Sequence, residues 1–270
     1  MYGNELDEAA KIVAAKREEN LKFEHARLTA DEKDQLLKEY HPDRIASQFE
    51  ELKIGPNKGQ KAPIELAAML QAKPRIEPEH IDLAHVDYET DVLVIGGGGA
   101  GTSAAIMASE AGANVLLATK LRIGDANTMM AEGGIQAADK PNDSPAQHYL
   151  DAFGGGHFDG KPELVYTLVN KAPSVIKWLN DLGVEFDKEA NGTMVTTHGG
   201  GTSRKRMHAC KDYSGAEIMR TLRDEVLNRP DKITVIDFTA AIEIIKDDKG
   251  NACGAVLMNV ETNEIKIAKA

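Results

Sequence analysis

The sequence has little of what builds disulfide-rich or membrane-spanning proteins. Its 270 residues contain only two cysteines, Cys210 and Cys253, which cannot form a disulfide framework and are typical of a reducing compartment. No C-x-x-C pair occurs, so we expect no iron–sulfur cluster in this chain. No apolar run approaches the roughly 18 residues of a membrane span, and the charged N-terminus lacks the apolar segment of a signal peptide. We therefore expect a cytoplasmic protein without a direct membrane span, which other subunits could attach to a membrane.

Basic residues are also scarce relative to acidic ones. Lys and Arg total 32 against 43 Asp and Glu, which gives a net charge of -11. Such a chain repels phosphate backbones, so we expect no nucleic-acid partner. An anionic ligand is still compatible with this charge, because a glycine-rich loop can bind phosphate through backbone N–H groups. With 42% hydrophobic residues, the chain can bury a core of ordinary globular size.

The sequence changes character near Tyr88. The residues before it are charged and contain no β-rich runs, and Thr29–Glu32 forms a capping box that predicts a helix. A second short helix is expected over 63–72, followed by extended chain from Pro74. We interpret residues 1–87 as a helical N-terminal arm that packs on another surface. A solvated, partly disordered tail is the alternative.

Residues 88–270 have the pattern of an α/β domain. A strand over 91–95, a helix over 99–111 and a strand over 114–119 predict a βαβ unit. Helices are then expected from Ser144-Pro145, from Pro162 and over 214–227, with Pro173 interrupting the second. Four β runs at 233–236, 240–245, 255–260 and 264–268 follow, and the last of them closes a small antiparallel meander. We expect the apolar residues of the Pro162 helix to be core: Leu164, Leu168, Val175, Trp178 and Leu179.

The first strand leads into a glycine-rich loop. Gly96, Gly98 and Gly101 form a G-x-G-x-x-G motif between a strand and a helix, which is the context of a dinucleotide site. Gly96 permits the turn, Gly98 admits a pyrophosphate and Gly101 allows close packing of helix on strand. The second strand ends in Thr119-Lys120 rather than in the acidic residue of a typical NAD site, which favours FAD over NAD.

Several longer segments resemble one family. VIGGGGAG at 94–101, LLATK at 116–120, NTMMAEGGIQAA at 127–138, WLNDLGVEFD at 178–187 and HGGGTSRKRMHACKDYSGAEIMRTL at 198–222 are similar to the flavoprotein subunit of the fumarate reductase/succinate dehydrogenase/L-aspartate oxidase family. The resemblance covers about residues 88–270. It implies a Rossmann-like FAD-binding domain with an antiparallel meander, and it leaves the arm outside the shared region.

The resemblance also implies which residues bind FAD. The turn at Glu132-Gly133-Gly134 lies against the flavin ring in family members, and two glycines let the backbone reach a flat ring edge. The cofactor-binding residues expected on this basis are Gly96, Gly98, Gly99, Ala100, Gly101, Thr119, Lys120, Asn127, Thr128, Ala131, Glu132, Gly133, Gly134 and Ala241.

Asn127 stands where respiratory members of the family carry a histidine bonded covalently to the flavin. An amide cannot form that bond, so the resemblance implies non-covalent FAD. The family chemistry then leans toward reduction of a double bond or toward an oxidase.

His198 is the expected substrate residue. L-aspartate oxidases carry a glutamate at this place, where it meets the substrate ammonium, and an imidazole would not favour an ammonium group. This argues for a dicarboxylate without an amine, although a histidine with a plain hydrogen-bonding role is the open alternative. Arg204, Lys205, Arg206 and His208 form the one basic cluster, interpreted either as an anion-attracting lip or as a solvated loop paired with acids. We expect no metal site.

Three functions remain open from sequence. The first is an FAD-dependent oxidoreductase that reduces or oxidises a dicarboxylate and works with an iron–sulfur electron-transfer subunit. The second is L-aspartate oxidase, and the third is a flavin electron-transfer subunit without its own substrate. The family's catalytic residues lie later than residue 270, so we expect this chain alone to be catalytically incomplete, as a fragment or as one of two polypeptides.

Overall fold

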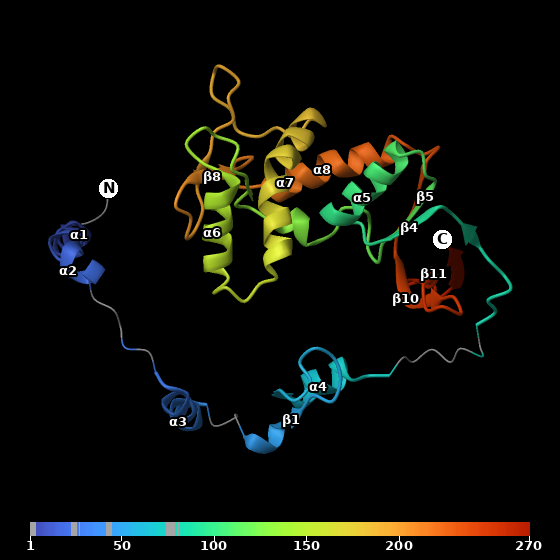
Figure 1. Cartoon of the computed structure of the whole chain (residues 1–270), viewed down its shortest axis with the longest axis horizontal. Coiled ribbons are helices and arrows are strands. Elements are labelled where there is room, and N and C mark those ends of the chain that lie inside the picture. Colours follow the sequence, from blue (N-terminus) through green and yellow to red (C-terminus); the bar gives the residue numbers. More distant parts are fainter. Residues whose placement is uncertain (1–3, 23–25, 27, 42–44, 74–78, 80) are drawn as a thin grey trace. The chain divides into compact units, whose positions relative to one another are not determined.

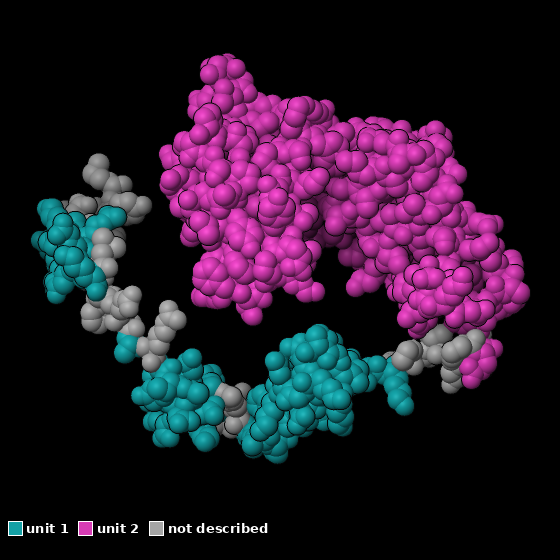
Figure 2. Space-filling model, viewed as in Figure 1, with its two compact units in different colours: residues 1–77 teal, residues 78–270 magenta. Residues whose placement is uncertain are grey.

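A computed structural model of the chain describes residues 4–22, 26, 28–41, 45–73, 79 and 81–270. The chain divides into two compact units, residues 1–77 and 78–270 (Figure 2). The sequence predicts a boundary after residue 87, and that assignment stays a prediction. The extended segment expected from Pro74 lies largely outside the described residues.

The first unit combines helices with a small hairpin. Its helices are α1 (Asn4–Ala15), α2 (Arg17–Lys22), α3 (Ala30–Tyr40) and α4 (Ile64–Leu70), and its strands are β1 (Phe49–Glu51) and β2 (Lys61–Pro63), with the 3-10 turn η1 (Ala46–Gln48) before them (Figure 1). The predicted capping box of α3 is confirmed, because the Glu32 amide donates to Thr29 Oγ1 at 3.3 Å and the Thr29 amide donates to the Glu32 carboxylate at 2.7 Å. The antiparallel β1–β2 pair was not expected in a helical arm. The small buried cluster of this unit consists of Leu52, Ala62 and, in α4, Ala67.

The second unit is built around a parallel sheet. Strands β4 (Val92–Ile95), β5 (Val115–Ala118) and β9 (Ile233–Ile236) pair in the order β4-β5-β9. Helices α5 (Gly99–Glu110) and α8 (Ser214–Leu227) pack on one another beside it (Figure 1). The predicted strand–helix–strand unit is therefore present, and Gly112 follows α5 with a φ of 95° as a C-terminal cap residue requires.

A second sheet contains the chain's last strands. Strands β10 (Thr239–Lys246), β11 (Ala252–Asn259) and β12 (Ile265–Lys269) form the expected antiparallel meander, and β3 (Tyr88–Glu89) adds to β12 in parallel. The run at 233–236 does not join the meander, because β9 pairs with β5 in the parallel sheet instead.

The third part of this unit holds the remaining elements. Two helices, α6 (Pro145–Gly155) and α7 (Pro162–Asp181), pack side by side. Next to them β6 (Ile135–Gln136), β8 (Lys205–His208) and β7 (Thr197–His198) form a small antiparallel sheet in the order β6-β8-β7 (Figure 1). A 3-10 turn, η3 (Asn127–Met130), precedes β6.

Two expectations for α7 are wrong. Pro173 does not interrupt the helix, which continues through it to Asp181. Leu164, Leu168 and Val175 are not core, since they are 63%, 59% and 39% exposed. Leu179 is buried as expected, and Val169 and Ile176 are buried with it. None of the helices in the described part of the chain is both long and apolar enough to cross a membrane.

Candidate functional site

The glycine-rich loop joins β4 to the N-terminus of α5. Gly96 takes a φ of 113°, which permits the turn, and its amide donates to the Ala118 carbonyl at 2.8 Å. Gly98 is the N-cap of α5 and has no side chain to cap the first turn. The amides at the start of α5, together with the positive end of the helix dipole, therefore form a site suited to an anion.

Steric contacts show why glycine is needed in this loop. A Cβ atom added to Gly101 would lie 1.8 Å from the Gly96 carbonyl oxygen, so any side chain there would force helix and strand apart. A Cβ on Gly97 would lie 2.9 Å from Thr119 Oγ1, and one on Gly99 would lie 3.0 Å from Thr128 Oγ1. The loop is thus packed against two of the threonines predicted to contact the cofactor.

Thr119 and Lys120, which follow β5, differ in their burial and their contacts. Thr119 is 5% exposed, its amide donates to the Ile236 carbonyl at 3.0 Å and its carbonyl accepts from the Thr239 amide at 2.8 Å. Lys120 is exposed. Thr119 is therefore fixed beside the glycine loop, whereas no hydrogen bond or ion pair among the described residues ties Lys120 to that loop.

The η3 turn brings a second group of predicted residues to the same place. Thr128 Oγ1 accepts a hydrogen bond from the Gly99 amide at 3.2 Å. The Ala131 carbonyl accepts from the Gly215 amide at 2.6 Å, at the start of α8. Asn127 is exposed at the start of η3. The turn is thereby fastened to two helix N-termini.

The predicted flavin turn at Glu132-Gly133-Gly134 leads into β6. Gly134 has a φ of 113°, and a Cβ there would lie 2.2 Å from the His208 carbonyl oxygen. Glu132 and Gly133 are exposed. Only glycine at 134 lets this turn pack directly on the backbone of β8.

A cavity of about 190 Å³ lies between these elements. Its lining includes residues predicted from sequence to contact FAD, namely Gly99, Thr128, Ala131 and Gly134, and α7 and α8 form other walls. A larger cavity of about 810 Å³ lies beside it, between α6, α7 and the loop 200–202, and Gly134, Ile135 and Val175 line both. Residues of the glycine loop, the η3 turn and the flavin turn therefore line the smaller cavity, and this cavity adjoins the larger one.

Two predicted residues lie apart from this group. His198 is exposed in β7, where it pairs with Lys205 of β8, and none of its contacts among the described residues brings it to the glycine loop. Ala241 is half-buried in β10 and packs against the cluster that contains Leu116 and Ala118 of β5.

The interpretation of the basic cluster is wrong for two of its members. Arg206 and His208 are fully buried, while Arg204 and Lys205 are exposed. Alternation along β8 places Arg206 and His208 on one face and Lys205 on the other, because successive side chains of a strand point to opposite faces. Arg204 precedes the strand. The cluster is therefore not solvated as a whole, although Arg206 and His208 are paired with acids as the second interpretation expected.

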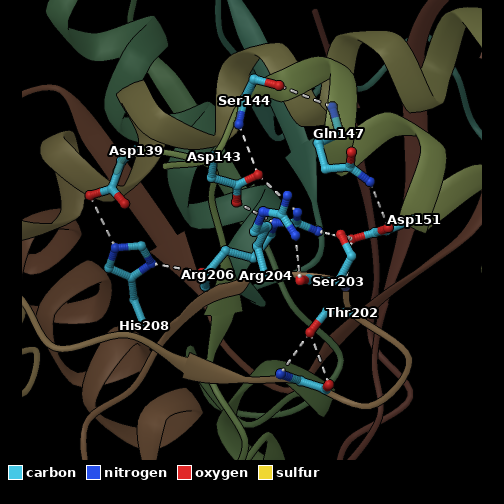
Figure 3. A network of polar contacts seen from close by, with 11 residues as sticks. Asp139, Asp143, Ser144, Gln147, Asp151, Thr202, Ser203, Arg204, Arg206 and His208 are labelled. Atoms are coloured by element: carbon cyan, nitrogen blue, oxygen red, sulfur yellow. Dashed lines mark hydrogen bonds and ion pairs between the residues drawn. The ribbon is translucent and has the colours of Figure 1, made fainter. Parts of the chain in front are cut away.

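Arg206 instead belongs to a buried polar network (Figure 3). Its Nε and Nη2 atoms donate to the two carboxylate oxygens of Asp143 at 2.7 and 2.9 Å, and Nη1 donates to Asp151 at 2.5 Å. Asp151 also accepts from the amide and hydroxyl of Ser203, at 2.9 and 2.8 Å. His208 Nε2 lies 3.2 Å from Asp139.

The network keeps both carboxylates ionised. The hydrogen bonds from the Arg206 guanidinium hold the pKa of Asp143 below its usual range, against the opposing effect of burial. Burial also acts to raise the pKa of Asp151, but the bonds from Ser203 and Arg206 outweigh it and the pKa falls. Burial, and then the nearby Arg206 charge, lower the pKa of His148, so this imidazole is neutral.

Sequence reasoning missed Asp143, Asp151 and Gly215. A Cβ on Gly215 would lie 1.9 Å from the Thr128 carbonyl oxygen, so this glycine lets α8 approach η3. The signal for Gly215 was the Ser214-Gly215 pair at the start of a predicted helix. Nothing in the sequence pairs Arg206 with aspartates more than fifty residues earlier. No cluster of metal-ligating side chains occurs in the described ranges.

The site fits a dinucleotide with a flavin. The N-terminus of α5 has no side-chain cap. The glycines of the loop leave space around it that Cβ atoms would fill. Residues 91–270 match the family model described as FAD binding domain. Comparison with known proteins therefore agrees with the geometry.

Related proteins support the same assignment. The chain is 36% identical over 181 residues to a subunit of the fumarate reductase (CoM/CoB) of Methanothermobacter marburgensis, covering 66% of this chain and 32% of that protein. It is 33% identical over 168 residues to L-aspartate oxidase of Streptomyces coelicolor, covering 62% and 29%.

A solved structure is similar as well. The apo Sdh1 complex of Mycobacterium smegmatis contains a chain 34% identical to this one, with a TM-score of 0.65, covering 68% of this chain and 33% of that one. The present chain thus spans about a third of the length of these relatives. The resemblance predicted from the sequence is confirmed: the chain belongs to the FAD binding domain family, and its cofactor is FAD.

Proposed function

We propose that this chain is the FAD-binding part of an oxidoreductase that acts on a dicarboxylate. The observation that supports this most strongly is the convergence of Gly99, Thr128 and Gly134 on one cavity at the N-terminus of α5. We assign the pyrophosphate to the loop amides and the flavin to the turn 132–134. When bound, FAD supplies two-electron redox chemistry.

The proposal extends to the finer features of the fold and its partners. We assign a Rossmann-like topology to residues 88–270 and a partner-binding role to the N-terminal arm. By analogy with the relatives, we propose a cytoplasmic flavoprotein that reaches a membrane only through other subunits and works with an iron–sulfur electron-transfer subunit. Lys120, Ala241 and His198 stay in the proposed site as predictions, with His198 facing the substrate.

A loss of FAD binding should follow from Gly98→Val. A Cβ at Gly98 already lies 3.0 Å from the Ala126 Cβ, and a branched side chain would also fill the space in front of the helix amides. The purified chain should retain FAD, measured by visible absorbance, and the variant should not. Gly155→Ala is the control, because a Cβ at Gly155 meets no atom within 4 Å. A folded Gly98→Val variant that purifies yellow would overturn the phosphate-loop assignment.

We further propose that FAD is held without a covalent bond. Asn127 offers an amide donor and acceptor but no nucleophilic ring nitrogen. Acid precipitation should therefore release the FAD into the supernatant and leave a non-fluorescent polypeptide. A fluorescent band after denaturing electrophoresis would show that the assignment of Asn127 is wrong.

The substrate assignment separates the candidates. In the complete protein, fumarate reduction by a reduced dye supports the dicarboxylate reductase. Hydrogen peroxide release on addition of aspartate supports L-aspartate oxidase. Similarity to an L-aspartate oxidase favours that second function. His198 argues against a substrate that carries an ammonium group. Reduction of FAD in the complete protein, without turnover of either substrate, supports an electron-transfer subunit.

A further inference from the structure

Arg206 lies at the centre of the buried network between α6 and β8 (Figure 3). Its side chain is 0% exposed, and those of Asp143 and Asp151 are 1% and 13% exposed. Asp143 precedes the first turn of α6, and Asp151 lies in the same helix. One guanidinium therefore binds the α6 segment at two separate points.

The backbone of Arg206 is linked to the flavin turn through β6. Its carbonyl accepts from the Ala137 amide at 2.9 Å, directly after β6, and it lies 3.1 Å from His208 Nδ1. Strand β6 pairs with β8 through Ile135–His208, and it begins immediately after Gly134. Since Gly134 packs on the His208 carbonyl, a displacement of β8 would displace the proposed flavin turn.

The same contacts fix the loop that follows His198. Asp151 binds both the amide and the hydroxyl of Ser203, so one end of the loop is tied to α6. The other end is tied by the pairing of His198 with Lys205, the residue beside Arg206. The loop is thus held between α6 and β8.

We propose that Arg206 is a positioning residue of the flavin site, which sets the placement of the turn 132–134 and of the His198 loop relative to α6. The inference rests on the proposed function, because that function assigns the turn to the flavin and His198 to the substrate.

Stability alone does not explain such an arrangement. Burying one cation and two carboxylates carries a large desolvation cost, and well-packed neutral side chains of similar volume are often as stabilising. What a guanidinium adds is geometry, because its planar fork binds a carboxylate through two parallel hydrogen bonds. An ammonium at this position would keep the charge and lose the fork.

The test compares Arg206→Lys with the triple variant Arg206→Met, Asp143→Asn, Asp151→Asn. The triple variant removes all three charges together and so leaves no unpaired buried charge. Val226→Ala is the stability control, since Val226 is fully buried in α8 and belongs to no contact of this network. Urea unfolding of the full chain establishes that each variant folds.

The informative readout is the bound flavin. Both network variants should bind FAD on the order of ten-fold more weakly, as expected for the loss of one charge-assisted hydrogen bond, and should change the visible circular dichroism of bound FAD. Val226→Ala should lower stability and leave the flavin spectrum unchanged. If the unaltered chain binds FAD while both network variants keep its spectrum and affinity, this inference is wrong and the proposed function stands. If the unaltered chain fails to bind FAD, the proposed function falls and this role falls with it.

Discussion

Single residues in the glycine loop divide into those that shape the fold and those that we propose to face the cofactor. Gly101 shapes the fold, because its position is closed by the Gly96 carbonyl. The sequence motif predicted this role correctly, since a fixed spacing of glycines reports a local steric requirement. Local requirements of this kind are what a sequence reveals best.

We predict that Gly101→Ala destabilises the protein even without FAD. The added Cβ would lie 1.8 Å from the Gly96 carbonyl oxygen, so helix and strand must separate. Overpacking of this kind costs about 1–3 kcal/mol. Urea unfolding of the FAD-free chain measures the loss, and Gly155→Ala, which has open space around its Cβ, should not reproduce it. Equal stability of the two variants would contradict the prediction.

The residues of the polar network were beyond the reach of sequence. Arg206 and its aspartates are distant along the chain, and a cluster of basic residues on a strand does not reveal which of them face inward. Only the register of β6 with β8 places Arg206 and His208 on the buried face. The mistaken interpretation of the basic cluster follows from that missing register.

His148 should make stability depend on pH near neutrality. Burial and Arg206 lower its pKa in the folded protein from 6.5, and Asp143 and Asp151 oppose the shift without reversing it. As the pH falls through about 6.5, the unfolded chain gains a proton that the folded chain does not bind, so the free energy of unfolding falls. The network aspartates lose their contribution only below their ordinary pKa of 3.8, which separates the two effects.

The measurement is the urea midpoint at pH values of about 7.5 and 5.5. His148→Gln removes the titrating group, so its midpoint should change less over this interval than that of the unaltered chain. A parallel decline in both proteins would assign the pH dependence to other groups.

Elements were predicted best where start and stop signals agree. Helix α8 and strand β9 have the predicted bounds, and α6 begins with Ser144 as its N-cap, whose hydroxyl accepts from the Gln147 amide at 3.2 Å. The expectation for Pro173 failed, because the rule that proline ends a helix is a tendency that tertiary packing overrides. Here Val169, Ile176 and Leu179 bury the helix on both sides of the proline.

Pro173→Ala should therefore stabilise α7. The proline lacks the amide that would bond the turn before it, and proline in a helix interior is roughly 3 kcal/mol less favourable than alanine. Part of that cost is already relieved by local adjustment, so we expect a gain of about 1–2 kcal/mol in urea unfolding. Ser174→Ala, a substitution at the adjacent exposed position, is the control and should change stability much less. A destabilised Pro173→Ala variant would show that the proline itself is required for packing.

At the scale of the whole molecule, the segment just before residue 91 is part of the second unit. The first unit has its own small core, while the family match begins at residue 91. The segment between them is not a neutral linker. The Asp87 amide donates to the Ile267 carbonyl at 2.9 Å, its carboxylate accepts from the Ile267 amide at 2.7 Å, and β3 then pairs with β12.

A truncation made before Asp87 therefore keeps these contacts, whereas a truncation made after Glu89 removes them. A chain of residues 78–270 keeps both hydrogen bonds to Ile267 and the β3–β12 pairing, whereas a chain of residues 90–270 loses them and exposes the edge of the β10-β11-β12-β3 sheet. We expect 78–270 to bind FAD as the full chain does, and 90–270 to be less stable and more prone to aggregate.

If the arm docks on a partner or on a second copy, gel filtration should show a smaller assembly for 78–270 than for the full chain after correction for mass. An unchanged assembly would favour a solvated tail, and a loss of FAD binding in 78–270 would mean that the arm contributes to the site itself.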